Sequence, residues 1–203
     1  MMIENKVVGS SDYKPVNSLK MLCKYLKEDL YHMGGAFINP LRWLMGEDCS
    51  RMKGYIYVLR ILEFLKNKSS LCLSNKMLYG PLYLFFYFWH KRQCYKYGVH
   101  IAPNKCDFGL RIVHPGGIHV NANHIGKFCT LTQGVVVGKK GTNENRPYIG
   151  DNVQLTLGCK VIGRVMVGNN TVVCPNSVVI KDLPDNVIAS GVPISIIRER
   201  KEF

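Results

Sequence analysis

The most regular feature of the chain is a branched apolar residue at every sixth position of its second half. These residues are Ile112 and Ile118, then Ile125, Leu131 and Val137, then Ile149, Leu155, Val161, Val167, Val173 and Val179. A period of six fits neither a helix nor an ordinary strand, and it is typical of a solenoid of short strands with a tight turn after each. Three such units close a triangular coil with the branched residues inside. The pattern therefore predicts a parallel β-helix over residues 98–193.

A second set of positions supports the same coil. Four residues after most of the branched residues comes a small or apolar side chain, namely Cys129, Val135, Val153, Cys159, Val165, Thr171 or Ser177. A glycine often follows the branched residue directly, at Gly126, Gly138, Gly150 and Gly168. Because glycine lacks a Cβ, it relieves crowding where the chain turns a corner. We expect both sets to line the inside and the corners of the prism.

Before residue 98 the apolar residues recur with a helical period. Leu19, Leu22, Leu26 and Leu30 predict a first helix, which Asn17 or Ser18 can cap and which ends at Gly34-Gly35. Further helices are predicted from Met52 to Lys66 and from about Ser74 to Tyr97, where Gly80-Pro81 starts or kinks the last one. We therefore expect a helical N-terminal segment over 1–97, and a basic C-terminal tail over 194–203.

The last predicted helix is rich in aromatic residues and ends in a basic run. It contains Tyr79, Tyr83, Phe85, Phe86, Tyr87, Phe88 and Trp89, followed by His90, Lys91 and Arg92. One interpretation buries this helix against the neighbouring domain or a sister subunit. The other gives residues 77–92 a peripheral membrane contact, with the basic end on anionic headgroups. The sequence does not separate the two.

Charge and cysteine content narrow the class of protein. The chain has 27 Lys and Arg against 14 Asp and Glu, a net charge of +13, which favours anionic partners such as phosphates, a nucleotide cofactor or an acidic membrane. The aromatic residues cluster in one apolar helix rather than on a basic face, so nucleic acid is not an expected partner. Its eight cysteines are isolated, which predicts reduced thiols, no metal site and, without a visible signal peptide, a cytoplasmic location. If residues 77–92 contact a membrane, we expect the protein at the inner, cytoplasmic face of that membrane.

Four stretches resemble a known family. They are Ile112-Val113-His114-Pro115-Gly116-Gly117-Ile118, Gly134-Val135-Val136-Val137-Gly138, Pro147-Tyr148-Ile149-Gly150 and Ala189-Ser190-Gly191-Val192-Pro193. Over about residues 99–193 the chain resembles the hexapeptide-repeat acyltransferases, and within them serine acetyltransferases and their relatives that O-acetylate surface polysaccharides. The resemblance implies a left-handed β-helix, acetyl-CoA as co-substrate, and a homotrimer whose active sites are shared between subunits.

By this resemblance His114 is the catalytic general base. A neutral imidazole can take the proton of a hydroxyl that attacks a thioester, and backbone N–H groups at Gly116-Gly117 or Gly134 could hold the oxyanion. The implied cofactor contacts are Gly138, Gly158, Cys159 and Pro175, with Lys139 or Lys181 near phosphate. Twelve residues rather than six separate Val137 from Ile149, so an extra loop leaves the prism. Arg146 in this loop is a candidate substrate contact, and His119 is expected at a subunit interface or at the substrate.

The chain departs from the serine acetyltransferase pattern at three places. Val99 and Val113 stand where that pattern has an Asp, and Asn145 where it has an Arg. We therefore expect a backbone carbonyl, water or a neighbouring subunit to orient His114. The missing charges favour a sugar hydroxyl of a surface polysaccharide as the acceptor, with L-serine as the alternative. A non-catalytic β-helix scaffold is the further alternative.

Overall fold

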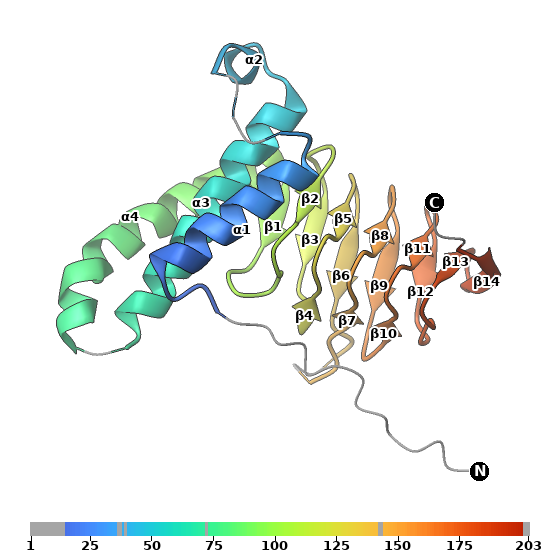
Figure 1. Cartoon of the computed structure of the whole chain (residues 1–203). Helices are drawn as coiled ribbons and strands as arrows, with labels where there is room; N and C mark the ends of the chain where they lie inside the picture. The colour runs from blue at the N-terminus through green and yellow to red at the C-terminus, as the bar shows by residue number, and fades with distance from the viewer. Residues whose placement is uncertain (1–14, 36–37, 39, 72, 142–143, 201–203) are drawn as a thin grey trace.

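A helical end and a three-sided prism of short strands follow each other along the chain in the computed structural model (Figure 1). The structure describes residues 15–35, 38, 40–71, 73–141 and 144–200. Residues 1–14 and 201–203, the ends of the predicted helical segment and of the predicted tail, lie outside the described residues. The change from helices to strands falls between residues 97 and 99, where the hydrophobic period changes.

Four helices are present among the described residues. They are α1 (Leu19–His32), α2 (Pro40–Leu44), α3 (Asp48–Ser69) and α4 (Leu73–Tyr97). Ser18 caps α1, since its Oγ accepts a hydrogen bond of 3.2 Å from the Met21 N–H, as the sequence predicted. The sequence did not predict α2. Helix α3 begins at Asp48, ahead of the predicted Met52, and Pro81 lies inside α4 rather than at its start.

The prism has three sheets, which we number in the order in which one coil passes through them, as residues 118–131 do. The first sheet contains β1 (Val99–Ile101), β3 (Ile118–Val120), β6 (Val136–Gly138), β9 (Lys160–Ile162) and β12 (Val178–Val179). The third sheet contains β2 (Arg111–Ile112), β5 (Thr130–Leu131), β8 (Gln154–Leu155), β11 (Val172–Val173), β13 (Val187–Ser190) and β14 (Ser195–Glu199). The second sheet contains β4 (His124–Ile125), β7 (Tyr148–Ile149) and β10 (Met166–Val167).

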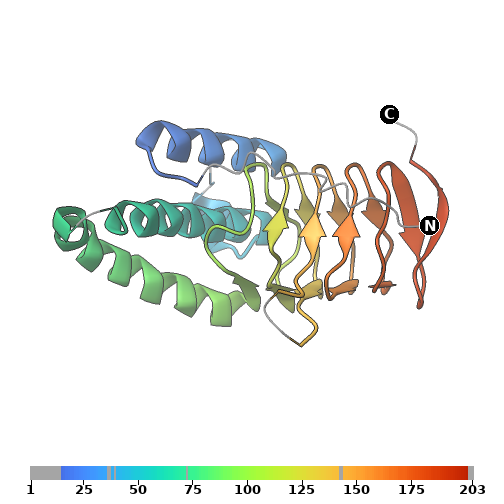
Figure 2. The ribbon, with the colours of Figure 1, turned by 90° about the horizontal axis from the view of Figure 1, so that it is seen from below.

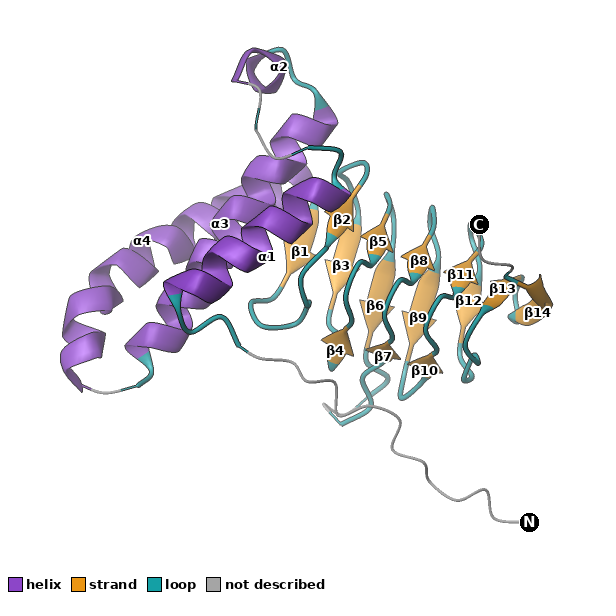
Figure 3. Cartoon of the chain, in the orientation of Figure 1, coloured by secondary structure: helices purple, strands orange, loops and turns teal. Residues whose placement is uncertain are grey.

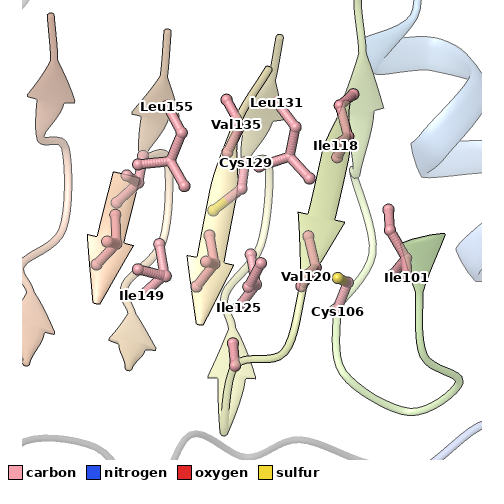
Figure 4. Close-up of a cluster of buried hydrophobic side chains, with 14 of the residues drawn as sticks. Ile101, Cys106, Ile118, Val120, Ile125, Cys129, Leu131, Val135, Ile149 and Leu155 are labelled. Carbon is pink, nitrogen blue, oxygen red and sulfur yellow. The ribbon is translucent and has the colours of Figure 1, made fainter. Parts of the chain in front are cut away.

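The interior of the prism is filled by the residues of the six-residue series. Every member from Ile112 to Val179 is buried, and so is each residue of the second set, including Cys159. Figure 4 shows Cys129 among the inward side chains. Neighbouring strands pair in parallel, so that Val120, Val137, Val161 and Val179 stack in register along the first sheet. The predicted parallel β-helix is therefore confirmed, and each buried Ile, Leu or Val contributes roughly 1.5–3 kcal/mol to its stability.

One corner of the prism explains why glycine recurs after the branched residue. A Cβ on Gly126 would collide with Asp151 Oδ1 and would lie 2.6 Å from the Gly150 carbonyl oxygen. The same Asp151 oxygen accepts a 2.8 Å hydrogen bond from the Lys127 N–H, so the side chain of one coil caps the turn of the preceding coil. Gly150 leaves room for Asn169 in the same way. Glycine is needed here because the stacked coil occupies the space of a side chain.

The C-terminal segment corrects one sequence prediction. Residues 194–203 were expected to form a basic tail, yet Ser195–Glu199 form β14, which pairs antiparallel with β13. Ile194, directly before this strand, is buried. The chain folds back because β13 would otherwise leave a row of unpaired backbone groups at the end of the third sheet.

A buried ion-pair cluster joins the helical end to the prism. Arg60 of α3 is fully buried, and its guanidinium donates to Asp29 of α1 at 2.7 Å and to Glu63 at 2.9 Å. It also donates to the backbone carbonyl oxygens of Cys106 and Asp107, in the first coil, at 2.8 and 2.6 Å. These bonds fix α3 against the prism.

A membrane-spanning helix is absent from the part of the chain that the structure describes, since none of its helices combines the required length and hydrophobicity.

Candidate active site

The predicted base, His114, lies in the turn between β2 and β3 and faces the beginning of α3. Its Nδ1 is 3.2 Å from Oδ2 of Asp48, the first residue of that helix. Both side chains remain accessible, with 58% of His114 and 45% of Asp48 exposed. A substrate can therefore reach the imidazole while the carboxylate holds its other side.

The helix positions Asp48 well for this contact. A carboxylate in the first turn is favoured by the helix dipole and the free N–H groups there. Before it, Glu47 accepts a 2.6 Å hydrogen bond from Ser50 Oγ, which fixes the entry into the helix. Because Arg60, further along α3, is bound to the first coil of the prism, the helix end is held beside the turn that carries His114.

A cavity of about 530 Å³ opens at this pair. It is lined by Met33, Gly46, Glu47, Asp48, Cys49, Arg111, Ile112, Val113 and His114. Two carboxylates therefore come from the start of α3, and one guanidinium comes from β2. Such a pocket can hold a small acceptor with groups of opposite charge beside the imidazole.

The Asp48–His114 contact corrects the expectation for the group that orients the histidine. The sequence suggested a backbone carbonyl, water or a neighbouring subunit, whereas the structure provides a carboxylate of the same chain. Val99, at the position of the family's orienting Asp, is fully buried in the prism. No sequence signal marked Asp48, because it lies 66 residues before His114 and only the packing of α3 brings them together.

The corner that carries His114 also carries part of the predicted cofactor site. Its turns stack through backbone hydrogen bonds, from the Gly134 N–H to the Gly116 carbonyl (2.9 Å) and from the Gly158 N–H to the Gln133 carbonyl (2.9 Å). Pro175 lies in the next turn of the stack, before Asn176, whose N–H donates to the Leu157 carbonyl (2.8 Å). We call this stack of turns the histidine corner. The Gly134 amide is used within it, which leaves Gly116-Gly117 as the candidate oxyanion turn.

Cys159 follows the histidine corner but points inward. Its thiol is buried in the prism, and burial raises its pKa to about 12. Its N–H donates to the Thr156 carbonyl at 3.1 Å. The thiol therefore cannot contact a ligand in an external groove, and only the backbone around Gly158 offers a surface to one.

The other predicted residues lie in or shortly after strands of the first sheet, whose places Figure 3 shows, except Arg146, which precedes β7. Gly138, Lys139 and Arg146 flank the loop that leaves the prism between β6 and β7, and Lys181 follows β12. This second corner, between the first and second sheets, we call the loop corner. His119 is exposed on the outer face of β3, and its ring centroid lies 5.6 Å from that of His100. One chain thus holds His114 and the loop at opposite edges of the first sheet.

Among the residues that the structure covers, no group of three His, Cys, Asp or Glu side chains is arranged to hold a metal ion. The pair of His114 and Asp48 offers an accessible imidazole with a carboxylate on one ring nitrogen. With Asp48 accepting from Nδ1–H, the other nitrogen, Nε2, is left as a proton acceptor. This is the tautomer that a general base acting on a hydroxyl requires.

The fold is similar to that of solved serine acetyltransferases, and this similarity confirms the predicted left-handed β-helix. Serine acetyltransferase from Brucella abortus strain S19 is similar with a TM-score of 0.69 and 22% identity, over 90% of this chain and 71% of that one. A serine acetyltransferase in complex with CoA gives a TM-score of 0.65 at 22% identity, over 88% and 71% of the two chains. Serine acetyltransferase from Neisseria gonorrhoeae in complex with serine gives a TM-score of 0.64 at 22% identity over 89% of this chain and 71% of that chain.

Sequence comparison points to the same proteins. The chain is 32% identical over 104 residues to a serine acetyltransferase of Synechococcus elongatus, which covers 49% of this chain and 43% of the relative. It is 33% identical over 106 residues to a serine acetyltransferase of Staphylococcus aureus, over 50% of each protein. No protein-family model matches the chain. The matches thus span about half the length of the curated relatives.

Proposed function

We propose that the protein is an acetyl-CoA-dependent O-acetyltransferase in which His114 is the general base. The observation that carries this proposal is the contact between His114 Nδ1 and Asp48 Oδ2 at the mouth of a cavity. A hydroxyl is a weak nucleophile until a base takes its proton, and an imidazole held in one tautomer can do so near neutral pH.

The reaction is a direct transfer. His114 Nε2 takes the proton of the acceptor hydroxyl as the oxygen attacks the thioester carbonyl of acetyl-CoA. The turn at Gly116-Gly117 is placed to donate to the oxyanion of the tetrahedral intermediate. When the intermediate collapses, the C–S bond breaks and the imidazolium returns the proton to the CoA sulfur. Asp48 stabilises the imidazolium between these steps.

The cofactor and the loop require a second copy of the chain. Gly158 and Pro175 lie on the histidine corner, whereas Gly138, Lys139 and Lys181 lie on the loop corner of the same prism. A homotrimer that sets the histidine corner of one copy against the loop corner of its neighbour would unite them. The exposed Lys139 and Lys181 fit the phosphates of CoA, and a serine acetyltransferase of this fold has been solved with CoA.

L-serine is the acceptor that the pocket favours. Asp48 can receive an ammonium group, and Arg111, which also lines the cavity, can pair with a carboxylate. These charges come from α3 and β2, and they substitute for those that Val99 and Val113 lack. The relatives named serine acetyltransferase, and the related structure solved with serine, favour the same acceptor.

The free cysteines of the described chain fit a reducing cytoplasm as the location of the protein.

A sugar hydroxyl of a surface polysaccharide is the second candidate. Three departures from the serine acetyltransferase pattern favour it, namely Val99, Val113 and Asn145. They remove charges that would bind an amino acid. His119 and Arg146 would then contact the sugar from the first sheet and the loop. The two acceptors differ in charge, so the pocket's own charged residues discriminate between them.

The test is CoA thiol release from acetyl-CoA with L-serine, N-acetyl-L-serine, L-serine methyl ester and N-acetylglucosamine as acceptors. We expect turnover with L-serine and weak turnover with the two serine derivatives, each of which lacks one charge. Arg111→Met should raise the KM for L-serine, while the matched exposed variant Arg164→Met should not. Turnover with the sugar alone would transfer the assignment to the polysaccharide acceptor. No thiol release with any acceptor, together with no CoA binding by calorimetry, would favour the scaffold.

A further inference from the structure

Helix α4 exposes a long apolar face to solvent. Its exposed residues include Met77, Leu78, Leu82, Leu84, Phe85, Phe88, Trp89 and Tyr95, with exposed fractions from 43% for Trp89 to 78% for Tyr95. Most of them lie on one side of the helix over more than four turns, because they follow the spacing of three and four residues. Single exposed apolar residues are ordinary, but a contiguous patch of this length marks an interaction surface.

The opposite side of α4 is already used for packing. Tyr79, Tyr83 and Phe86 pack with Phe64 of α3 in one hydrophobic cluster. Nearer the prism, His90 is buried, and its Nε2 lies 3.2 Å from the hydroxyl of Tyr55. Figure 2 shows α4 as an outer layer of the helical end, with α3 between it and α1. The exposed side therefore faces away from the molecule.

Charge indicates what covers this face. Between Glu63 and Asp107 the chain carries no acidic residue, but it carries Lys66, Lys68, Lys76, Lys91, Arg92, Lys96 and Lys105. Lys76, Lys91, Arg92 and Lys96 are exposed on α4 itself. In a symmetric interface between two copies of α4, these cations would meet one another without a carboxylate from the same segment. Anionic headgroups, in contrast, pair with all of them.

We propose that α4 docks the protein on an anionic bilayer surface. The apolar face lies at the boundary between headgroups and acyl chains, and the four exposed cations of α4 contact the headgroup phosphates and carboxylates. Trp89 and Tyr95, close to Lys91 and Arg92, fit the interfacial layer that such side chains prefer. None of the residues lining the cavity at His114 belongs to α4, so docking is independent of the proposed reaction.

The first measurement uses Trp89 as a reporter. The chain has two tryptophans, Trp43 and Trp89, so Trp43→Phe in the full chain leaves Trp89 alone. Vesicles of phosphatidylcholine mixed with phosphatidylserine should shift its emission to the blue and protect it from acrylamide. Vesicles of phosphatidylcholine alone should do so much less. Added salt should weaken the response, because exposed charges are screened.

The second measurement is cosedimentation of variants with the same vesicles. Phe85→Ser with Phe88→Ser should lower binding at least about tenfold, because two large apolar side chains leave the interface. Lys91→Gln with Arg92→Gln should also lower it, by about thirtyfold, since each cation contributes about 1 kcal/mol near an anionic surface. Leu41→Ser with Leu44→Ser on α2 removes apolar side chains of similar exposure, 65% and 73%, and should leave binding unchanged.

Thermal unfolding of each variant checks that the fold is intact. The proposal is overturned if the wild-type chain does not bind the anionic vesicles. It is also overturned if the Phe85 and Phe88 variant binds as well as wild type, or if the α2 variant loses binding equally. If the wild-type chain does not bind vesicles and the Phe85 and Phe88 variant forms a smaller assembly than wild type, a second copy of the chain covers the apolar face of α4.

Discussion

Asp48 Oδ2 and His114 Nδ1 lie 3.2 Å apart although 66 residues separate them in the chain. The carboxylate comes from the first turn of a helix, and the imidazole from a corner of the prism. The helical end thus supplies the group that the β-helix lacks at Val99.

His114→Ala removes the proposed base. Thiol release with the best acceptor should fall by about 10²- to 10⁴-fold, the usual contribution of a positioned acid–base group. Binding of CoA, measured by calorimetry, should remain, because the base does not hold the cofactor. His124→Ala, at another corner of the prism, is the control. Full turnover by the His114 variant would disprove the assignment of the base.

Asp48→Asn keeps the shape of the side chain but no longer stabilises the imidazolium. We expect kcat to fall by about 10²-fold or more, with little change in the KM for acetyl-CoA. Glu199→Gln, an exposed carboxylate on β14, serves as the control. An unchanged kcat in the Asp48 variant would mean that something else orients the histidine.

Gly126→Ala tests the packing of the prism corner. The added Cβ would collide with Asp151 and the Gly150 carbonyl, so unfolding free energy should fall by about 1–3 kcal/mol or more. Gly80→Ala is the matched control, because nothing lies within 4 Å of its Cβ position. In helix α4 that change should stabilise by about 0.5–1 kcal/mol. Denaturant unfolding of both variants should therefore give opposite signs, and equal signs would contradict the corner geometry.

Asp29→Ala tests the cluster that holds α3 against the prism. It leaves the fully buried Arg60 without one of its two carboxylates, which should cost about 3–5 kcal/mol. Arg42→Ala breaks the exposed pair with Glu47 and should cost at most about 1 kcal/mol. Chemical denaturation measures both. If the two variants lose similar stability, the buried cluster does not hold the two parts together.

His90 should make stability depend on pH. Burial first, and then the charges of Lys91 and His100, lower the pKa of His90 from 6.5 to about 4. Between these pH values the unfolded chain binds a proton that the folded chain does not, so stability is lost as pH falls from about 6.5 toward 4. We expect a lower Tm at pH 5 than at pH 7, and a smaller difference in His90→Gln. Because the pKa values of His100 and His124 are lowered too, the variant should reduce the difference rather than abolish it. An equal difference in both proteins would exclude His90 as a cause.

The sequence by itself determined the architecture of the second half. The six-residue period predicts which side chains face inward, and each one from Ile112 to Val179 is buried. The prediction succeeds because only one face of each strand in a closed coil points to the interior. The hydrophobic period of the first half also predicted its helices, apart from α2. The end of the chain was not, because β14 forms by pairing with the edge of β13 rather than from a local pattern.

Only the tertiary structure decided the site. A local pattern reports the period of a strand or helix, but not which distant segment packs beside it. Asp48 therefore could not be assigned to His114 from the sequence. The same holds for the apolar residues of α4, whose composition fits burial and exposure equally well. Their position on the outer side of α3 depends on long-range packing, and that packing also sets the carboxylate beside the imidazole.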